Sequence, residues 1–153
     1  MTKIKVIFSM LLICFLCGIT GCKKQIQTFS SPQGKAFFEA IDQYSQKNEH
    51  NYVLLDLRKR DASYANGHFF GFMNYDIEQG SLEELGNHLQ MMHHKKKTIF
   101  IIDEDGQAVE QVASYLASIG YRKIRVYLGG YQALLSYNEQ YFQVVTGLED
   151  CDC

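Results

Sequence analysis

The sequence predicts an α/β fold: one domain with a mainly parallel five-stranded sheet and helices on both faces. Short apolar runs of strand length alternate with segments of helical spacing between residues 25 and 137. The run at 98–102 is continuously apolar, which is typical of a strand buried on both faces of a parallel sheet. A chain of 153 residues with 46% hydrophobic and 21% charged residues has the size and composition of one globular domain.

The first residues of the chain predict export and a lipid anchor. Residues 1–5 form a short cationic region, and residues 6–19 are nearly continuously apolar. This apolar run is shorter than the roughly 20 residues that a membrane-spanning helix needs, and it fits a secretory signal. The run Ile19-Thr20-Gly21-Cys22 is similar to a bacterial lipobox. We therefore expect a lipoprotein signal peptide at 1–21, an acylated Cys22 and a tether at 22–24.

Two alternatives for this segment stay open, a plain signal peptide cut near residues 18–21 and a marginal membrane anchor. With the lipobox, the protein is an exported lipoprotein that Cys22 holds to a membrane of the bacterial cell envelope. The charge of -2 gives no argument for a nucleic acid as partner.

The first half of the domain shows three strands and a helix in its pattern. A short strand is expected near 25–29. Ser31 and Pro32 begin a helix, since a capping hydroxyl precedes proline at the first helical position. Residues 52–57 read as a buried strand, and residues 69–75 as a third strand.

The second half alternates in the same way. Residues 81–92 form a helix that opens with a capping box, because Glu84 follows Ser81 by three residues. The strand at 98–102 leads into a helix at 107–119. A last strand at 124–128 precedes a double-glycine turn and a further helix at 131–137.

The acidic run Asp103-Glu104-Asp105 directly follows the strand at 98–102. Parallel sheets bind ligands at the carboxyl ends of their strands, so this run marks a candidate site. Three interpretations compete: capping of the next helix, for which Asp105 is well placed, a weak cation site, and a recognition surface for a basic partner. No metal is expected, because Val109 stands where a calcium loop continues with ligands.

Four motifs in order together resemble the rhodanese (sulfurtransferase) family over about residues 25–137. They are Leu55-Asp56-Leu57-Arg58, the segment 64–74 with Gly67, His68, Gly71 and Asn74, the loop 103–108 with Gly106, and the segment 126–134 with Gly129 and Gly130. The resemblance implies that Asp56, Arg58, Gly67, His68, Gly71, Gly129 and Gly130 are framework residues. It sets the domain at 25–140, followed by a C-terminal tail at 141–153.

The resemblance also implies that the loop is catalytically degenerate. In that family the residue after the strand is the sulfur-carrying cysteine, and here it is Asp103, which cannot form a persulfide. Ala108 and Val109 stand where active members often carry arginine and serine or threonine. The related phosphatase chemistry needs a cysteine and an arginine as well. The degenerate loop is Asp103, Glu104, Asp105, Gly106, Gln107 and Ala108.

These observations predict a lipid-anchored, catalytically degenerate domain that acts as a binding or accessory module, without a cofactor. A protein partner at the acidic loop is the expected ligand. The alternative is a sulfur-handling enzyme in which Cys151 or Cys153 replaces the missing loop cysteine, because residues 23–150 contain no cysteine.

Overall fold

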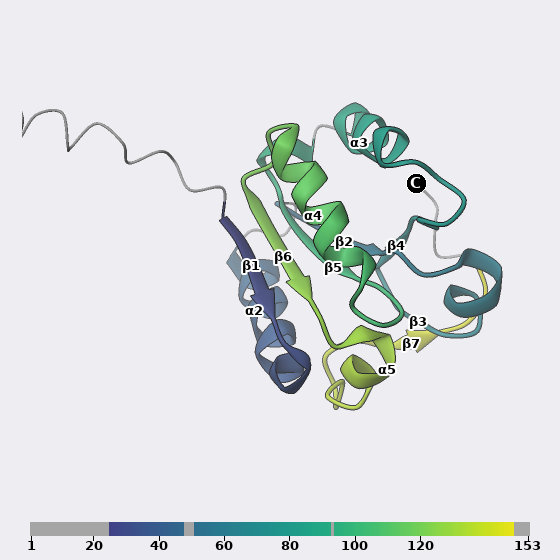
Figure 1. Cartoon of the computed structure of the whole chain (residues 1–153). Coiled ribbons are helices and arrows are strands. Elements are labelled where there is room, and N and C mark those ends of the chain that lie inside the picture. The colour runs from purple at the N-terminus through teal and green to yellow at the C-terminus, as the bar shows by residue number, and fades with distance from the viewer. Residues whose placement is uncertain (1–24, 48–50, 93, 149–153) are drawn as a thin grey trace, which may run out of the picture.

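A computed structural model describes residues 25–47, 51–92 and 94–148, which form an α/β domain (Figure 1). Its main sheet has the strand order β1-β6-β5-β2-β4. All four strand pairings are parallel, which confirms the predicted five-stranded sheet. The strands are β1 Gln25–Phe29, β6 Lys123–Tyr127, β5 Thr98–Ile102, β2 Tyr52–Asp56 and β4 Met73–Asn74.

Helices cover both faces of this sheet, as predicted. Among the described residues, the α-helices are α2 Gly34–Lys47, α3 Leu82–Met91, α4 Ala108–Ser118 and α5 Gly130–Leu135, with short helical turns η1 Ser31–Gln33, η2 Arg60–Tyr64 and η3 His94–Lys96. On β5, Ile99 and Ile101 pack with α3 and α4, whereas Phe100 and Ile102 pack with α2 and α5. Because successive side chains of a strand point to opposite faces, both layers of core come from the same apolar run.

The predicted strand at 69–75 is wrong as a single element. It divides into β3 His68–Phe69 and β4, and only β4 belongs to the main sheet. Gly71 adopts a positive φ of 86°, and the amide of Phe72 bonds the carbonyl of Phe69 at 3.1 Å. This turn carries Phe72 into the core beside α2, so the chain changes sheets there.

The folded part of the chain extends past residue 140, where we expected the tail to begin. β7 Val144–Val145 pairs antiparallel with β3 and forms a separate two-stranded sheet. Phe142 packs against the rings of Phe38 and Phe72, with centroids 5.6 and 5.5 Å away. Residues 141–148 therefore belong to the packed domain, and the cysteines at 151 and 153 lie outside the described residues.

The described residues contain no helix that is both long enough and apolar enough to span a membrane. The predicted signal peptide and Cys22 lie outside the described residues.

Candidate functional site

The loop between β5 and α4 is organised around the carboxylate of Asp103, which is 3% exposed. Oδ1 accepts a hydrogen bond from the amide of Gly106 at 2.5 Å, and Oδ2 accepts from Ala108 at 2.7 Å. A longer bond of 3.3 Å comes from Val109. Ala108 and Val109 are the first two residues of α4, and the first amides of a helix have no carbonyl of that helix to bond. The carboxylate therefore accepts hydrogen bonds from three backbone amides that follow it in the chain.

One role of the acidic run is thus to cap α4. The residue that does so is Asp103, and the prediction of Asp105 as the cap was wrong. Asp105 accepts a bond only from the amide of Gln107, at 3.0 Å and two residues away. Asp103 directly follows β5, and its carboxylate accepts bonds from amides three to six residues later in the chain. The sequence pattern did not predict that this side chain points toward the start of α4.

Opposing effects act on the charge of Asp103. Burial raises the pKa of the carboxyl, and the amide bonds from Gly106 and Ala108 oppose that rise. The negative charge of Asp105 adds to the rise. The start of a helix is a favourable place for an anion because the peptide dipoles point their positive ends there.

The double-glycine turn holds this loop by direct contact between backbones. Gly106 and Gly130 have positive φ angles of 88° and 74°. A Cβ on Gly106 would collide with the carbonyl of Leu128, and one on Gly130 with the carbonyl of Glu104. The amide of Tyr131 also bonds the carbonyl of Asp103 at 2.9 Å. Larger residues at 106 and 130 would separate the two segments.

Gly129, the other glycine of this turn, lies against β6. A Cβ on Gly129 would crowd the ring and hydroxyl of Tyr127, at 2.5 Å from the hydroxyl oxygen.

Asp56 and Arg58 form a buried ion pair beside the loop. The Arg58 guanidinium donates to Asp56 at 2.7 Å and to the carbonyl of Gly67 at 2.9 Å. It also stacks 3.5 Å from the centre of the Tyr131 ring. Burial raises the pKa of Asp56, and the bonds and charge of Arg58 oppose this. One guanidinium therefore joins the end of β2, the turn at Gly67 and α5.

The structure places His68 and Gly71 away from the acidic loop. His68 is fully buried, its Nδ1 lies 3.1 Å from the carbonyl of Tyr64, and its ring stacks on Tyr64 at 3.7 Å. Gly71 forms the turn between β3 and β4. Neither residue lines the cleft beside Asp103, so their positions fit the framework role that the family resemblance implies.

A cleft of about 430 Å³ lies beside the loop. Glu104 and Asp105 are exposed on it, and an ion pair between Lys59 and Glu78 at 3.0 Å stands across from them. The lining residues are Leu57, Arg58, Lys59, Ser63, Ile77, Glu78, Asp103, Glu104, Asp105, Gln107 and Ala108. Sequence reasoning missed Lys59, Ser63, Ile77 and Glu78, because no local motif connects them with the loop.

The residues that line this cleft include no cysteine and no cluster of metal ligands. No cysteine occurs between residues 23 and 150. Within the described ranges, no three histidine, aspartate or glutamate side chains lie where they could hold a metal ion. What the cleft does offer is a set of carboxylates on its rim, the exposed Glu104 and Asp105 among them, and a buried arginine.

Comparisons with protein families and with solved structures both identify the rhodanese-like fold. A family model of the rhodanese-like domain matches residues 39–136. The Alr3790 protein from Anabaena superposes with a TM-score of 0.57 at 18% identity, covering 74% of this chain and 81% of that chain. The rhodanese-like domain of Alr3790, in a solution structure, gives 0.55 at 17% identity, covering 82% and 83%.

A third solved structure is Ygr203w from yeast, described as a protein tyrosine phosphatase of the rhodanese family. Its TM-score is 0.52 at 16% identity, covering 82% of this chain and 95% of that chain. At these identities the similarity shows the fold alone. No curated protein matches the sequence.

The first prediction concerns the carboxylate in the loop. Asp103→Ala leaves the amides of Gly106 and Ala108 without their acceptor, so we expect a loss of about 1–3 kcal/mol in the free energy of unfolding. The matched control is Asp105→Ala, which removes a single exposed bond and should cost less. Urea unfolding measures both variants. Equal losses would show that the three amide bonds to Asp103 do not organise the loop.

Proposed function

The chain belongs to the rhodanese-like domain family, and we propose that it is a non-catalytic member that binds a partner protein at the envelope of a bacterial cell. The observation that carries this proposal is that the Asp103 carboxylate accepts hydrogen bonds from the backbone amides of its own loop and of the start of α4. A sulfurtransferase needs a thiolate held at low pKa by backbone amides and a helix start. A carboxylate takes that place here and forms no persulfide.

The surroundings of Asp103 also oppose sulfur and phosphoryl chemistry. Four acidic residues line the cleft, Glu78, Asp103, Glu104 and Asp105, and its two cations, Arg58 and Lys59, are already paired with carboxylates. Anionic donors such as thiosulfate or a phosphate ester are therefore repelled. Ala108 provides no cation for such a group. The phosphatase activity described for the yeast protein is therefore not part of the proposal for this chain.

The retained framework supports a binding role. Asp56 and Arg58 still hold the wall of the cleft, and Gly106 and Gly130 still pin the loop. The result is a shaped cleft with exposed carboxylates and no nucleophile. A basic segment of a partner protein fits such a rim, because opposite charges across an interface speed association and favour the right partner.

The proposed anchor is Cys22. The lipobox-like run ends at this residue, and β1 begins at Gln25, three positions later. The domain would then be held close to the membrane by its first strand. One acyl chain binds a membrane only marginally, and several chains hold it stably.

The second prediction is a lack of sulfur transfer. The purified protein should not move sulfur from thiosulfate to cyanide above background, because position 103 has no thiol. A Cys151→Ser, Cys153→Ser variant is the control for the rival chemistry. Turnover that this variant loses would support a tail cysteine as nucleophile, and turnover that it keeps would contradict the assignment of Asp103.

The third prediction tests recognition by the acidic rim. Glu104→Gln with Asp105→Asn should weaken capture of envelope proteins in a pull-down, most strongly at low salt, where screening is least. The fold should hold, because Asn can still accept the bond that Asp105 accepts. Thermal melts measure the fold alongside.

The matched control for the rim is Glu83→Gln with Glu110→Gln. Both residues are exposed and neither lines the cleft, and the change in charge is the same. Capture that falls equally in both double variants would mean that net charge, and not the rim, sets binding. An unchanged partner set at both salt concentrations would remove the recognition hypothesis.

The fourth prediction concerns the anchor. Cys22→Ser should release the protein from the membrane fraction or leave it unprocessed. Cys17→Ser is the matched control, since Cys17 lies in the segment that processing would remove, and it should fractionate like wild type. A Cys22→Ser protein that is processed and anchored normally would show that no lipid is attached there.

A further inference from the structure

The starts of four parallel strands lie level at one end of the domain. The register sets Gln25 beside Lys123 and Tyr52 beside Thr98. Ile99 of β5 pairs with Ile124 of β6, one residue after Thr98 and Lys123, so the first residues of the four strands form one row. With about 4.8 Å between neighbouring strands, this row is about 14 Å wide. We name it the strand-start end.

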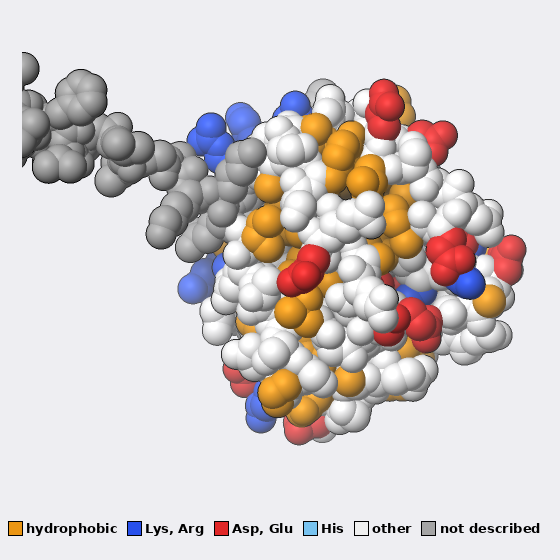
Figure 2. Space-filling view, in the orientation of Figure 1, with side chains coloured by type: hydrophobic (Ala, Val, Ile, Leu, Met, Phe, Trp, Pro, Cys, Tyr) orange, Lys and Arg blue, Asp and Glu red, His pale blue; other side chains and the backbone are white. Residues whose placement is uncertain are grey.

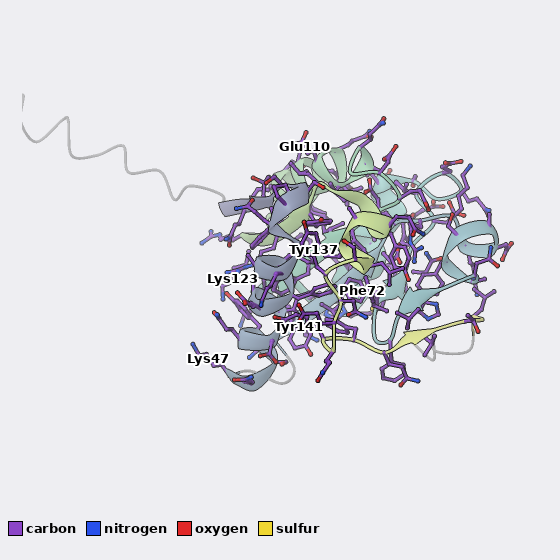
Figure 3. All side chains as sticks on the ribbon, turned by 90° about the horizontal axis from the view of Figure 1, so that it is seen from below. Lys47, Phe72, Glu110, Lys123, Tyr137 and Tyr141 are labelled. Atoms are coloured by element: carbon purple, nitrogen blue, oxygen red, sulfur yellow. The ribbon has the colours of Figure 1, made fainter. Side chains whose placement is uncertain are left out.

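Exposed basic side chains gather at the strand-start end. Lys47 ends α2, Lys95 and Lys96 lie just before β5, Arg122 lies just before β6 and Lys123 begins β6; all five are exposed. Figure 2 shows blue side chains gathered next to the start of β1, and Figure 3 places Lys47 and Lys123 on one side of the domain. The two ion pairs between described residues involve none of the five.

The acidic cleft lies at the other end of the strands. α4 runs from the acidic loop back to the strand-start end, with Gln107 just before its first residue and Ser118 at its last. Its 11 residues give a separation of about 16 Å along the helix. The five exposed cations therefore lie at one end of the strands, and the exposed Glu104 and Asp105 lie at the other, where the exposed Lys59 is paired with Glu78.

The tether fixes which end lies near a membrane. Cys22 precedes Gln25 by three residues, and an extended chain covers at most about 3.6 Å per residue. Whatever conformation these residues adopt, an acylated Cys22 holds the start of β1 within about 11 Å of the membrane surface. That distance is about one Debye length, about 8–10 Å, so a cation level with the start of β1 would still feel the field of anionic lipids.

We propose that the strand-start end is a membrane-facing surface for anionic lipid headgroups, which rests on the proposed anchor at Cys22. Lys95, Lys96, Arg122 and Lys123 then lie against the headgroups beside the tether. The acidic cleft is turned away from the membrane, where a basic partner can reach it. Near an anionic membrane surface each lysine or arginine strengthens the contact about fivefold.

The fifth prediction uses reporters at the two ends of α4. The full chain, with Cys151→Ser and Cys153→Ser, receives a fluorescent label at Ser118→Cys or at Gln107→Cys, both exposed positions. It is reconstituted in phosphatidylcholine vesicles with phosphatidylglycerol and a quencher attached to headgroups. The label at 118 should be quenched several-fold more than the label at 107. Equal quenching at the two positions would overturn the proposed surface.

Charge variants separate attraction from the length of the tether. Lys96→Gln with Lys123→Gln should weaken the contact about fivefold per charge and reduce the difference between the two labels. The matched control, Lys35→Gln with Arg60→Gln, changes two exposed cations that lie away from the strand-start end and should keep the difference. A difference that persists unchanged in the first variant, or in vesicles without phosphatidylglycerol, would refute the surface.

A separate measurement, the mass of the residue at position 22, tests whether Cys22 is acylated. An acylated protein with equal quenching at both labels refutes the surface and leaves the anchor. A protein without acyl groups that still floats with phosphatidylglycerol vesicles through Lys96 and Lys123 refutes the anchor and leaves the surface. A protein that is neither acylated nor bound to these vesicles refutes both.

Discussion

The hydrogen bonds that Asp103 accepts from its loop and from the start of α4 organise the end of the sheet where the candidate site lies. A buried helix start must find acceptors for its amides, from its own chain or from a ligand. Asp103 supplies them from within, at 2.5 and 2.7 Å for Gly106 and Ala108. The same amides that could stabilise a thiolate or a bound anion are thereby occupied. One residue after β5 gives the loop a stable shape and removes its nucleophile.

The rest of the site keeps its form because it depends on contacts that do not involve the nucleophile. Arg58 bonds Asp56 and the carbonyl of Gly67 and stacks on Tyr131. Losing one member of a buried ion pair leaves the other charge uncompensated, which costs about 3–5 kcal/mol. The ion pair therefore contributes to stability whether or not the loop carries a nucleophile. The cleft beside it keeps a rim with exposed carboxylates.

The sequence predicted the sheet because continuous apolar runs such as 98–102 have few other stable arrangements. It failed at 69–75, where the positive φ of Gly71 and the burial of Phe72 outweigh the apolar pattern. Local spacing favoured Asp105 as the cap. The direction of the Asp103 side chain follows instead from the backbone at the end of β5, which the local pattern does not give. The pair of Lys59 and Glu78 is 19 residues apart in sequence, and only the fold brings it to the cleft.

The topology itself separates the tether from the cleft. In the main sheet β1 is parallel to β6, β6 to β5, β5 to β2 and β2 to β4, so its five strands start at the same end and finish at the other. A chain that enters through Gln25 must arrive at the strand starts, while ligand sites of parallel sheets form at the strand ends. Five residues of strand span about 17 Å. The proposed anchor just before β1 would hold the domain at the strand starts, and the acidic cleft would then lie at the end turned away from the membrane.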